Sequence, residues 1–192
     1  MKEIQFSIPS SWAEISIGRF EEIARLEDEN PYERTVQLLE ILTGLSEKDI
    51  RSLPATTFEG SDIAEKLAFL KKEPRKVMPR TEITLNGTKY VMHLNPNKWT
   101  AGQYLDYNAS LVSSENKRIA RIIACFTIPK DHKYGDGYDF ERVVDDINDY
   151  MSIEEGLGYA DFFRLQLESY EGALRAYTER KKRRSTRRRA RK

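Results

Sequence analysis

Three residues are natural starting points for chemistry in this sequence: the histidines His93 and His132 and the single cysteine, Cys125. The two histidines are far apart along the chain. His93 alternates with the apolar Met92 and Leu94, so we expect it to face solvent. Cys125 lies in the apolar run IIACF without a nearby base, which predicts a buried, unreactive thiol. A single cysteine also excludes an internal disulfide.

Aspartates and glycines gather near Lys130–Gly137, where Asp131, Asp136 and Asp139 could be imagined around a calcium ion. The D-x-D-x-D-G order and the terminal glutamate of an EF-hand are missing, so an exposed turn is the better interpretation. Gly156-Leu157-Gly158 lacks the third glycine and the preceding strand of a dinucleotide-binding loop.

A second acidic cluster, Asp145, Asp146 and Asp149, lies on a predicted helix without a partner site. This pattern is typical of a charged face in contact with solvent. Taken together, these residues predict a protein that is not an enzyme, with no catalytic residues, no metal site and no cofactor.

The strongest charge signal comes from the last fourteen residues, 179–192, which hold ten of the 32 basic residues and one of the 31 acidic residues. The other 22 basic and 30 acidic residues give residues 1–178 a formal charge of −8. We therefore expect a single mixed helical domain over residues 1–178 and a basic C-terminal arm over residues 179–192. The basic positions of the arm are Arg180, Lys181, Lys182, Arg183, Arg184, Arg187, Arg188, Arg189, Arg191 and Lys192.

Three interpretations of the arm are open at this point. It could be a solvated extension, it could bind a nucleic-acid backbone by releasing counterions, or it could dock on the acidic body of a neighbouring copy. The arm contains no aromatic residue, which argues against stacking on single-stranded bases.

Local signals in the first half of the chain predict a short strand and several helices. The alternation in Ile4–Ile8 indicates the strand. Ser16 is a typical helix cap, and Asn30–Gly44 has a cap, a proline at the first helical position and a closing glycine. Further helices are predicted over Ser46–Pro54 and around Ile63–Leu70.

The clearest local signal is Asn86-Gly87 between two alternating runs, which predicts a type I′ hairpin over Thr81–Leu94 with Ile83 opposite Tyr90. The strand at Ile4–Ile8 would be its third strand. The expected fold is therefore α+β, mainly α-helical, with a small antiparallel β-sheet made of the hairpin and the N-terminal strand.

The second half of the chain predicts four more helices. Thr100–Gln103 is a capping box, and apolar spacing indicates helices over Asn116–Phe126 and Phe140–Ile147. Ser152 begins another capping box, although the glycines that follow should delay the regular helix to about Tyr159.

A narrow apolar seam runs along this last helix, with alternating spacings of three and four residues. Packing against the chain's own core is the favoured interpretation, because the seam is shorter than the three to four heptads that indicate a coiled coil. A contact with one partner helix is the alternative. The seam residues are Phe163, Leu167, Tyr170, Leu174 and Tyr177.

Three stretches, SIPSSWAEISIGRFEEI, ERTVQLLEILTGLSEKDIRSLP and LNPNKWTAGQYLDY, resemble small virion structural proteins of tailed bacteriophages, particularly the neck and tail ring proteins of crAss-like phages of gut Bacteroidota. The resemblance implies a head-to-tail connector or tail ring subunit, made in the host bacterial cytoplasm and incorporated in the virion. It implies a cyclic homo-oligomer, other phage structural proteins as partners and DNA as a possible target of the arm, without a membrane. A tail assembly chaperone and an independent nucleic-acid-binding protein are the alternatives.

Overall fold

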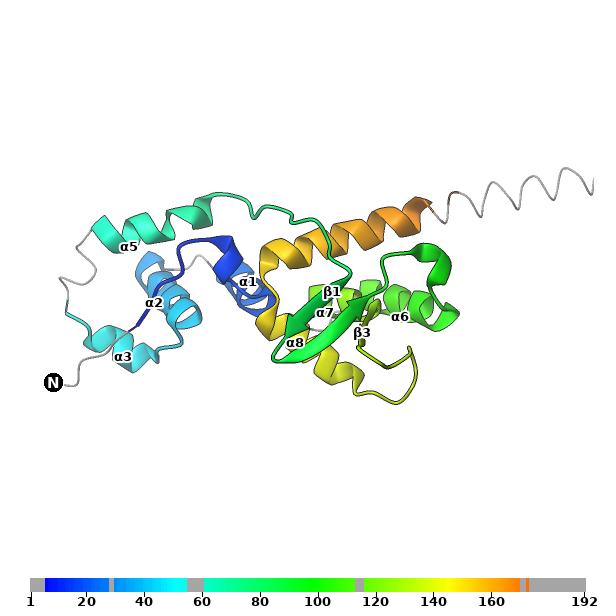
Figure 1. Ribbon diagram of the computed structural model, residues 1–192. Helices are drawn as coiled ribbons and strands as arrows, with labels where there is room; N and C mark the ends of the chain where they lie inside the picture. Colours follow the sequence, from blue (N-terminus) through cyan, green and yellow to red (C-terminus); the bar gives the residue numbers. More distant parts are fainter. Residues whose placement is uncertain (1–5, 28–29, 55–60, 113–115, 170–171, 173–192) are drawn as a thin grey trace, which may run out of the picture.

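The computed structural model describes residues 6–27, 30–54, 61–112, 116–169 and 172. Within these ranges the protein is mainly helical with one small antiparallel sheet, which confirms the predicted α+β class (Figure 1). The basic arm lies outside the described residues.

The described residues up to Lys71 are helical or irregular, and those that follow contain the sheet and most of its helical cover. The helices are η1 (Trp12–Glu14), α1 (Ile17–Ala24), α2 (Pro31–Thr43), α3 (Glu47–Ser52), α5 (Ser61–Lys66), η2 (Leu67–Lys71), η3 (Pro96–Lys98), α6 (Ala101–Val112), α7 (Arg118–Ala124), α8 (Phe140–Tyr150) and a C-terminal helix described over 153–169. The strands are β1 (Glu82–Leu85), β2 (Thr88–Met92) and β3 (Thr127–Pro129).

The predicted helix starts are confirmed in the N-terminal half. Ser16, Asn30 and Ser46 each accept a backbone N–H from the first turn of their helix, at distances of 3.0 to 3.3 Å. Such caps satisfy amide groups that a helix leaves without partners. At the other end of α2, Gly44 adopts a φ of 73°, the left-handed conformation that closes helices at low cost.

The sheet has the order β1-β2-β3, and its hairpin has the predicted register, with Ile83 opposite Tyr90. The third strand is β3, which pairs with β2, so the prediction of an N-terminal third strand is wrong. Phe6–Ile8 forms no strand, and Ile8 packs instead beside Val36 of α2 and Ile50 of α3. The apolar side chains of Phe6 and Ile8 therefore pack against helices and not in a sheet.

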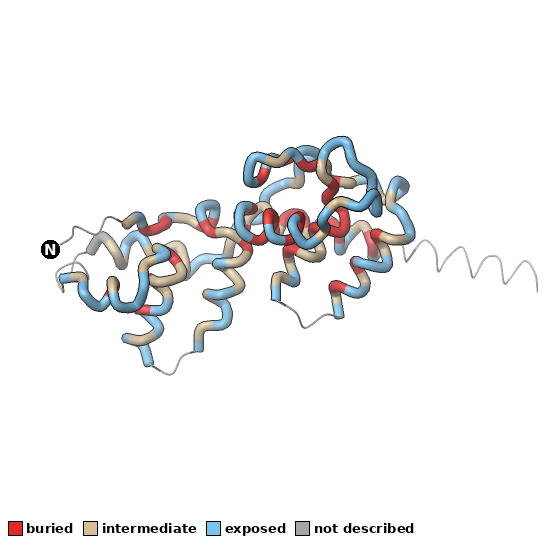
Figure 2. Tube along the Cα trace, turned by 90° about the horizontal axis from the view of Figure 1, so that it is seen from below, coloured by how far each residue is buried: buried red, intermediate tan, exposed pale blue. Residues whose placement is uncertain are grey.

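The buried apolar residues form two clusters (Figure 2). The larger one lies between the sheet, α1, α6, α7, α8 and the C-terminal helix. The smaller one contains Ile8, which precedes the first helix, with Val36 and Leu39 of α2 and Ile50 of α3. Leu67 of η2 packs against both clusters, so the two regions share a contact.

The C-terminal helix begins at residue 153, directly after its cap Ser152, and the predicted delay to Tyr159 is wrong. Gly156 and Gly158 are inside the helix because other parts of the chain approach them closely. A Cβ atom at Gly158 would lie 1.8 Å from the carbonyl oxygen of Val77. These glycines therefore allow close packing rather than a break in the helix.

Residues 72–81, which we name the crossing segment, run from η2 to β1 along the start of the C-terminal helix (Figure 1). The Val77 amide donates to the Glu154 carbonyl at 3.1 Å. The Tyr159 hydroxyl accepts from the Arg80 amide at 2.9 Å and donates to the Arg80 carbonyl at 2.8 Å. The segment that joins the two regions is thus attached to the C-terminal helix by its backbone.

Part of the predicted seam faces the chain's own core. Phe163 is fully buried, with its ring centroid 4.3 Å from that of Phe126 and 6.0 Å from that of Trp99. Leu167 is also buried in the larger cluster. The other three seam residues, Tyr170, Leu174 and Tyr177, lie outside the described residues.

Candidate functional site: an acidic groove

The residues that could carry chemistry are mostly used in the fold. Cys125 is fully buried, as predicted, and burial raises the pKa of its thiol to about 12. His93 is half-buried rather than facing solvent, because its ring lies 3.4 Å from the side-chain nitrogen of Gln103. Burial lowers the pKa of His93. Among the described residues, the side-chain hydrogen-bond neighbours are Ser110 for Cys125 and Gln103 for His93, and neither of these is an acid or a base.

The aspartates near Lys130–Gly137 organise turns. Asp136 accepts the Lys133 amide at 3.1 Å, and Asp139 caps α8 by accepting the Arg142 amide at 3.1 Å. Among the described residues, no group of three or more His, Cys, Asp or Glu side chains is placed to hold a metal ion.

Asp146 corrects the expectation of a solvent-facing acidic surface on α8. It is only 4% exposed and accepts hydrogen bonds from the Tyr90 hydroxyl at 2.5 Å and from the Asn86 amide nitrogen at 3.2 Å. Asp146 lies beside Val143 and Ile147 on the buried side of the helix, so it connects the hairpin to α8. Asp145 and Asp149 of the same cluster are exposed, as predicted.

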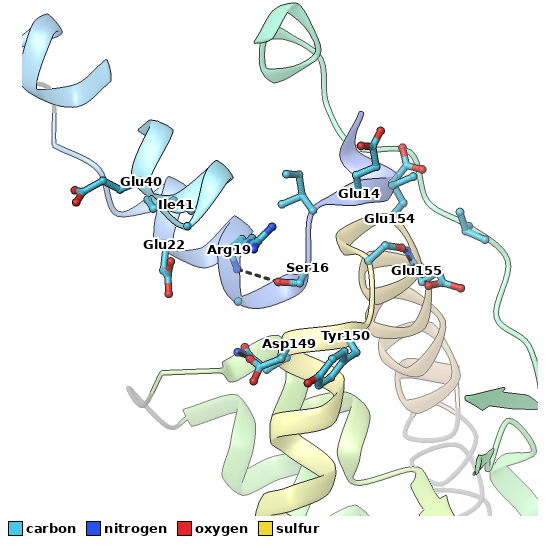
Figure 3. Close-up of a pocket in the computed structure, with 17 residues that line it drawn as sticks. Glu14, Ser16, Arg19, Glu22, Glu40, Ile41, Asp149, Tyr150, Glu154 and Glu155 are labelled. Carbon is cyan, nitrogen blue, oxygen red and sulfur yellow. Dashed lines mark hydrogen bonds between the residues drawn. The ribbon is translucent and has the colours of Figure 1, made fainter. Parts of the chain in front are cut away.

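The described part of the chain has an open groove of about 950 Å³. It lies where α1, the end of α2, the end of α8 and the first turn of the C-terminal helix meet (Figure 3). Six carboxylates and one cation line it, and we name it the acidic groove. The carboxylates are Glu14, Glu22, Glu40, Asp149, Glu154 and Glu155, and the cation is Arg19.

Two helix starts hold one wall of the acidic groove in place. Ser16 and Ser152, the caps of α1 and of the C-terminal helix, form an isolated antiparallel bridge. The Ile17 amide donates to the Met151 carbonyl at 3.1 Å, and the Ile153 amide donates to the Ile15 carbonyl at 2.8 Å. This bridge brings segments separated by more than 130 positions together, and with them the acids that flank each cap.

Three of the carboxylates have partners outside the groove lining. Glu14 accepts the Ser10 hydroxyl at 2.9 Å, and this bond lowers the pKa of Glu14. Glu154 accepts the Arg75 backbone amide at 3.2 Å. Glu155 forms an ion pair with Arg80. Of the six, Glu155 alone has a basic side-chain partner within the described ranges.

The remaining three acids, Glu22, Glu40 and Asp149, lie on the opposite side and the floor of the groove in Figure 3. Within the part of the chain that the structure describes, none of them is in an ion pair. Arg19 is exposed and lies among them, likewise without an ion pair there. The groove therefore carries a clear surplus of negative charge.

Asn148 adds a buried acceptor to the groove wall. Its side chain is 7% exposed, and its amide nitrogen donates to Asp149 at 2.7 Å. Its Oδ1 atom is buried and has no hydrogen-bond partner among the described residues. A Cβ atom at Gly18 would lie 2.4 Å from the Asn148 side-chain nitrogen, so a glycine is needed there for α1 to approach α8.

This arrangement of groups is suited to holding positive charge. Carboxylates accept hydrogen bonds and bind guanidinium groups through two parallel bonds, and the asparagine oxygen is a further acceptor. The groove could not be predicted from the sequence, because its residues come from four separate stretches of the chain. The only available signal was the formal charge of −8 on residues 1–178.

Comparisons of this chain with protein families, with curated proteins and with solved structures found no match. In the described ranges, no helix has the length and apolar character needed to span a membrane.

Proposed function

We propose that this protein is a structural subunit that works by assembly, as a head-to-tail connector or tail ring subunit of a phage virion. The observation that carries the proposal is the separation of charge: an acidic groove in the folded body and ten basic residues in the arm. A molecule with two unlike surfaces attracts further copies of itself in a head-to-tail manner. Such contacts produce rings when the rotation between subunits closes.

The roles of the polar residues support assembly rather than catalysis. Asp146 could have been a catalytic acid or base, but its carboxylate accepts hydrogen bonds from Tyr90 and Asn86. Cys125 is enclosed in the core with a raised pKa, which disfavours the reactive thiolate.

A role in binding nucleic acid independently receives less support. The acidic groove repels the phosphates that the arm would attract, so the body opposes the arm in that role. Binding of the arm to the groove of another copy brings opposite charges together, so the acidic body favours it.

Size-exclusion chromatography with light scattering tests the proposal, on the full chain and on a variant that lacks Lys181–Lys192. We expect an oligomer at low salt, without DNA, that dissociates as salt screens the charges, and a monomer for the variant. Electron microscopy of the oligomer should show closed rings. A full-length monomer at every salt concentration contradicts the proposal, and a shift only with duplex DNA supports the nucleic-acid-binding alternative.

Mass spectrometry of purified particles tests the place of the protein in the virion. We expect the chain in mature particles, in a fixed ratio to the other structural proteins. Its presence in infected cells but not in particles would instead indicate a tail assembly chaperone.

A further inference from the structure

We propose that the acidic groove is the binding site for the basic arm, residues 180–192, of a second copy of this chain. The inference rests on the proposed assembly function and adds to it the surface on which neighbouring copies meet.

The groove and the arm carry opposite charges. Six carboxylates and one arginine line the groove, and five of the six have no basic side-chain partner among the described residues. The arm supplies ten cations within thirteen positions. Partners of opposite charge associate quickly and in a defined register, and the attraction weakens as salt rises.

The Oδ1 atom of Asn148 supports the same occupant, for a reason that does not depend on net charge. A buried acceptor without a donor destabilises the free protein, so a ligand that donates a hydrogen bond there is favoured. Arginine and lysine side chains present only donors. A phosphate or a carboxylate presents acceptors and would leave this oxygen unpaired.

The position of the groove on the C-terminal helix indicates which copy supplies the arm. Glu154 and Glu155 lie in the first turn of the C-terminal helix, so the groove is at the beginning of that helix. Residues 153–169 then carry the chain about 25 Å along the helix axis, away from the groove (Figure 1). The last described turn of that helix thus lies at the opposite end of the helix from its own groove, which favours a neighbouring copy as the source of the arm.

The test uses two full-length variants and their mixture. The groove variant carries Glu22→Lys, Glu40→Lys and Asp149→Lys with an intact arm. The arm variant keeps the groove and changes Lys181, Arg184, Arg187, Arg188 and Arg191 to Glu. A control variant carries Glu65→Lys, Glu73→Lys and Glu82→Lys, three exposed acids outside the groove.

We expect each of the first two variants to be monomeric by light scattering, with an affinity for its own kind reduced about 100-fold or more. Mixed together, these two variants should form a 1:1 complex, because the intact arm of one meets the intact groove of the other. The control should oligomerise like the unmodified protein. At high salt, where none of the four proteins should self-associate, circular dichroism should show the same thermal midpoint for all of them, which excludes misfolding.

A smaller change addresses the buried acceptor. Asn148→Leu keeps the size of the side chain and removes the oxygen, and we expect it to weaken self-association about fivefold, the equivalent of one hydrogen bond.

The outcomes separate the inference from the proposed function. If the groove variant oligomerises normally while the arm variant does not, the arm docks elsewhere, and the groove assignment is overturned while assembly stands. A mixture that remains monomeric also overturns it, because an intact arm and an intact groove are then both present and do not bind each other. If the unmodified chain never self-associates, the proposed function fails together with the inference.

Discussion

The two apolar clusters of this protein are built in different ways. The smaller one joins α2 and α3, which are neighbours in the sequence, through Val36, Leu39 and Ile50. The larger one combines the hairpin, α8 and the C-terminal helix, whose residues are up to about eighty positions apart. Local contacts form at little cost in chain entropy, whereas distant ones require a larger buried surface. We therefore expect the larger cluster to dominate stability and the smaller one to open more easily.

The strongest test of this comparison is Phe163→Ala, at the centre of the larger cluster. Removing a fully buried ring that contacts Phe126 and Trp99 should lower the free energy of unfolding by about 3–5 kcal/mol. Urea denaturation followed by circular dichroism measures this loss. Leu165→Ala, at a 50% exposed position of the same helix, is the matched control and should change stability by less than about 0.5 kcal/mol.

Ile50→Ala removes a side chain from the smaller cluster. We expect a loss of about 2 kcal/mol, at the low end for such a change, because few neighbours depend on it. Hydrogen exchange should become faster in α2 and α3 while the amides of the hairpin keep their protection. Equal loss of protection in both regions would mean that the two clusters unfold as one unit, and would contradict the expectation that the smaller cluster opens more easily.

The connection between the two regions can be tested at Gly158. A Cβ atom there would meet the Val77 carbonyl oxygen at 1.8 Å, so Gly158→Ala must displace the crossing segment and should cost about 1–3 kcal/mol. Gly172→Ala is the control, because no described residue lies within 4 Å of its added atom. Hydrogen exchange that is faster at the Val77 amide but unchanged in α3 would show that the substitution loosens the crossing segment and not the smaller cluster. Unchanged stability would show that the segment is loosely held.

The smallest predicted effect concerns the buried pair formed by Tyr90 and Asp146. Tyr90→Phe removes one of two donors to Asp146 and should cost about 1 kcal/mol at neutral pH. Burial raises the pKa of Tyr90, so folding favours its neutral form. That contribution is complete below pH about 10, the ordinary value for tyrosine, and is lost as pH rises further. The stability difference between the two proteins should therefore shrink in alkali, as measured by urea denaturation at two pH values.

The features that the sequence predicted correctly are local ones. The caps at Ser16, Asn30 and Ser46 and the hairpin turn at Asn86-Gly87 depend on side chains within four positions of the groups that they satisfy. Short-range chemistry of this kind can be read directly from a sequence.

The features that were missed depend on long-range pairing. β3 is three residues long and ends in a proline, so nothing in its own sequence distinguishes it from a loop, and it is recognised only by its pairing with β2. The acidic groove has the same origin, since the bridge between Ser16 and Ser152 brings its walls together. Asp146 could have been found, because it lies beside the predicted apolar face of α8.

The crossing segment also has a consequence for the order in which the protein folds during synthesis. Its hydrogen bonds to Glu154 and Tyr159 span about eighty positions, so they cannot form until the C-terminal helix has left the ribosome. The helices of the smaller cluster can collapse well before that point, because their partners are close in sequence. We expect the N-terminal helices of the nascent chain to form first, and the C-terminal helix to complete later both the hydrogen bonds to the crossing segment and one wall of the groove.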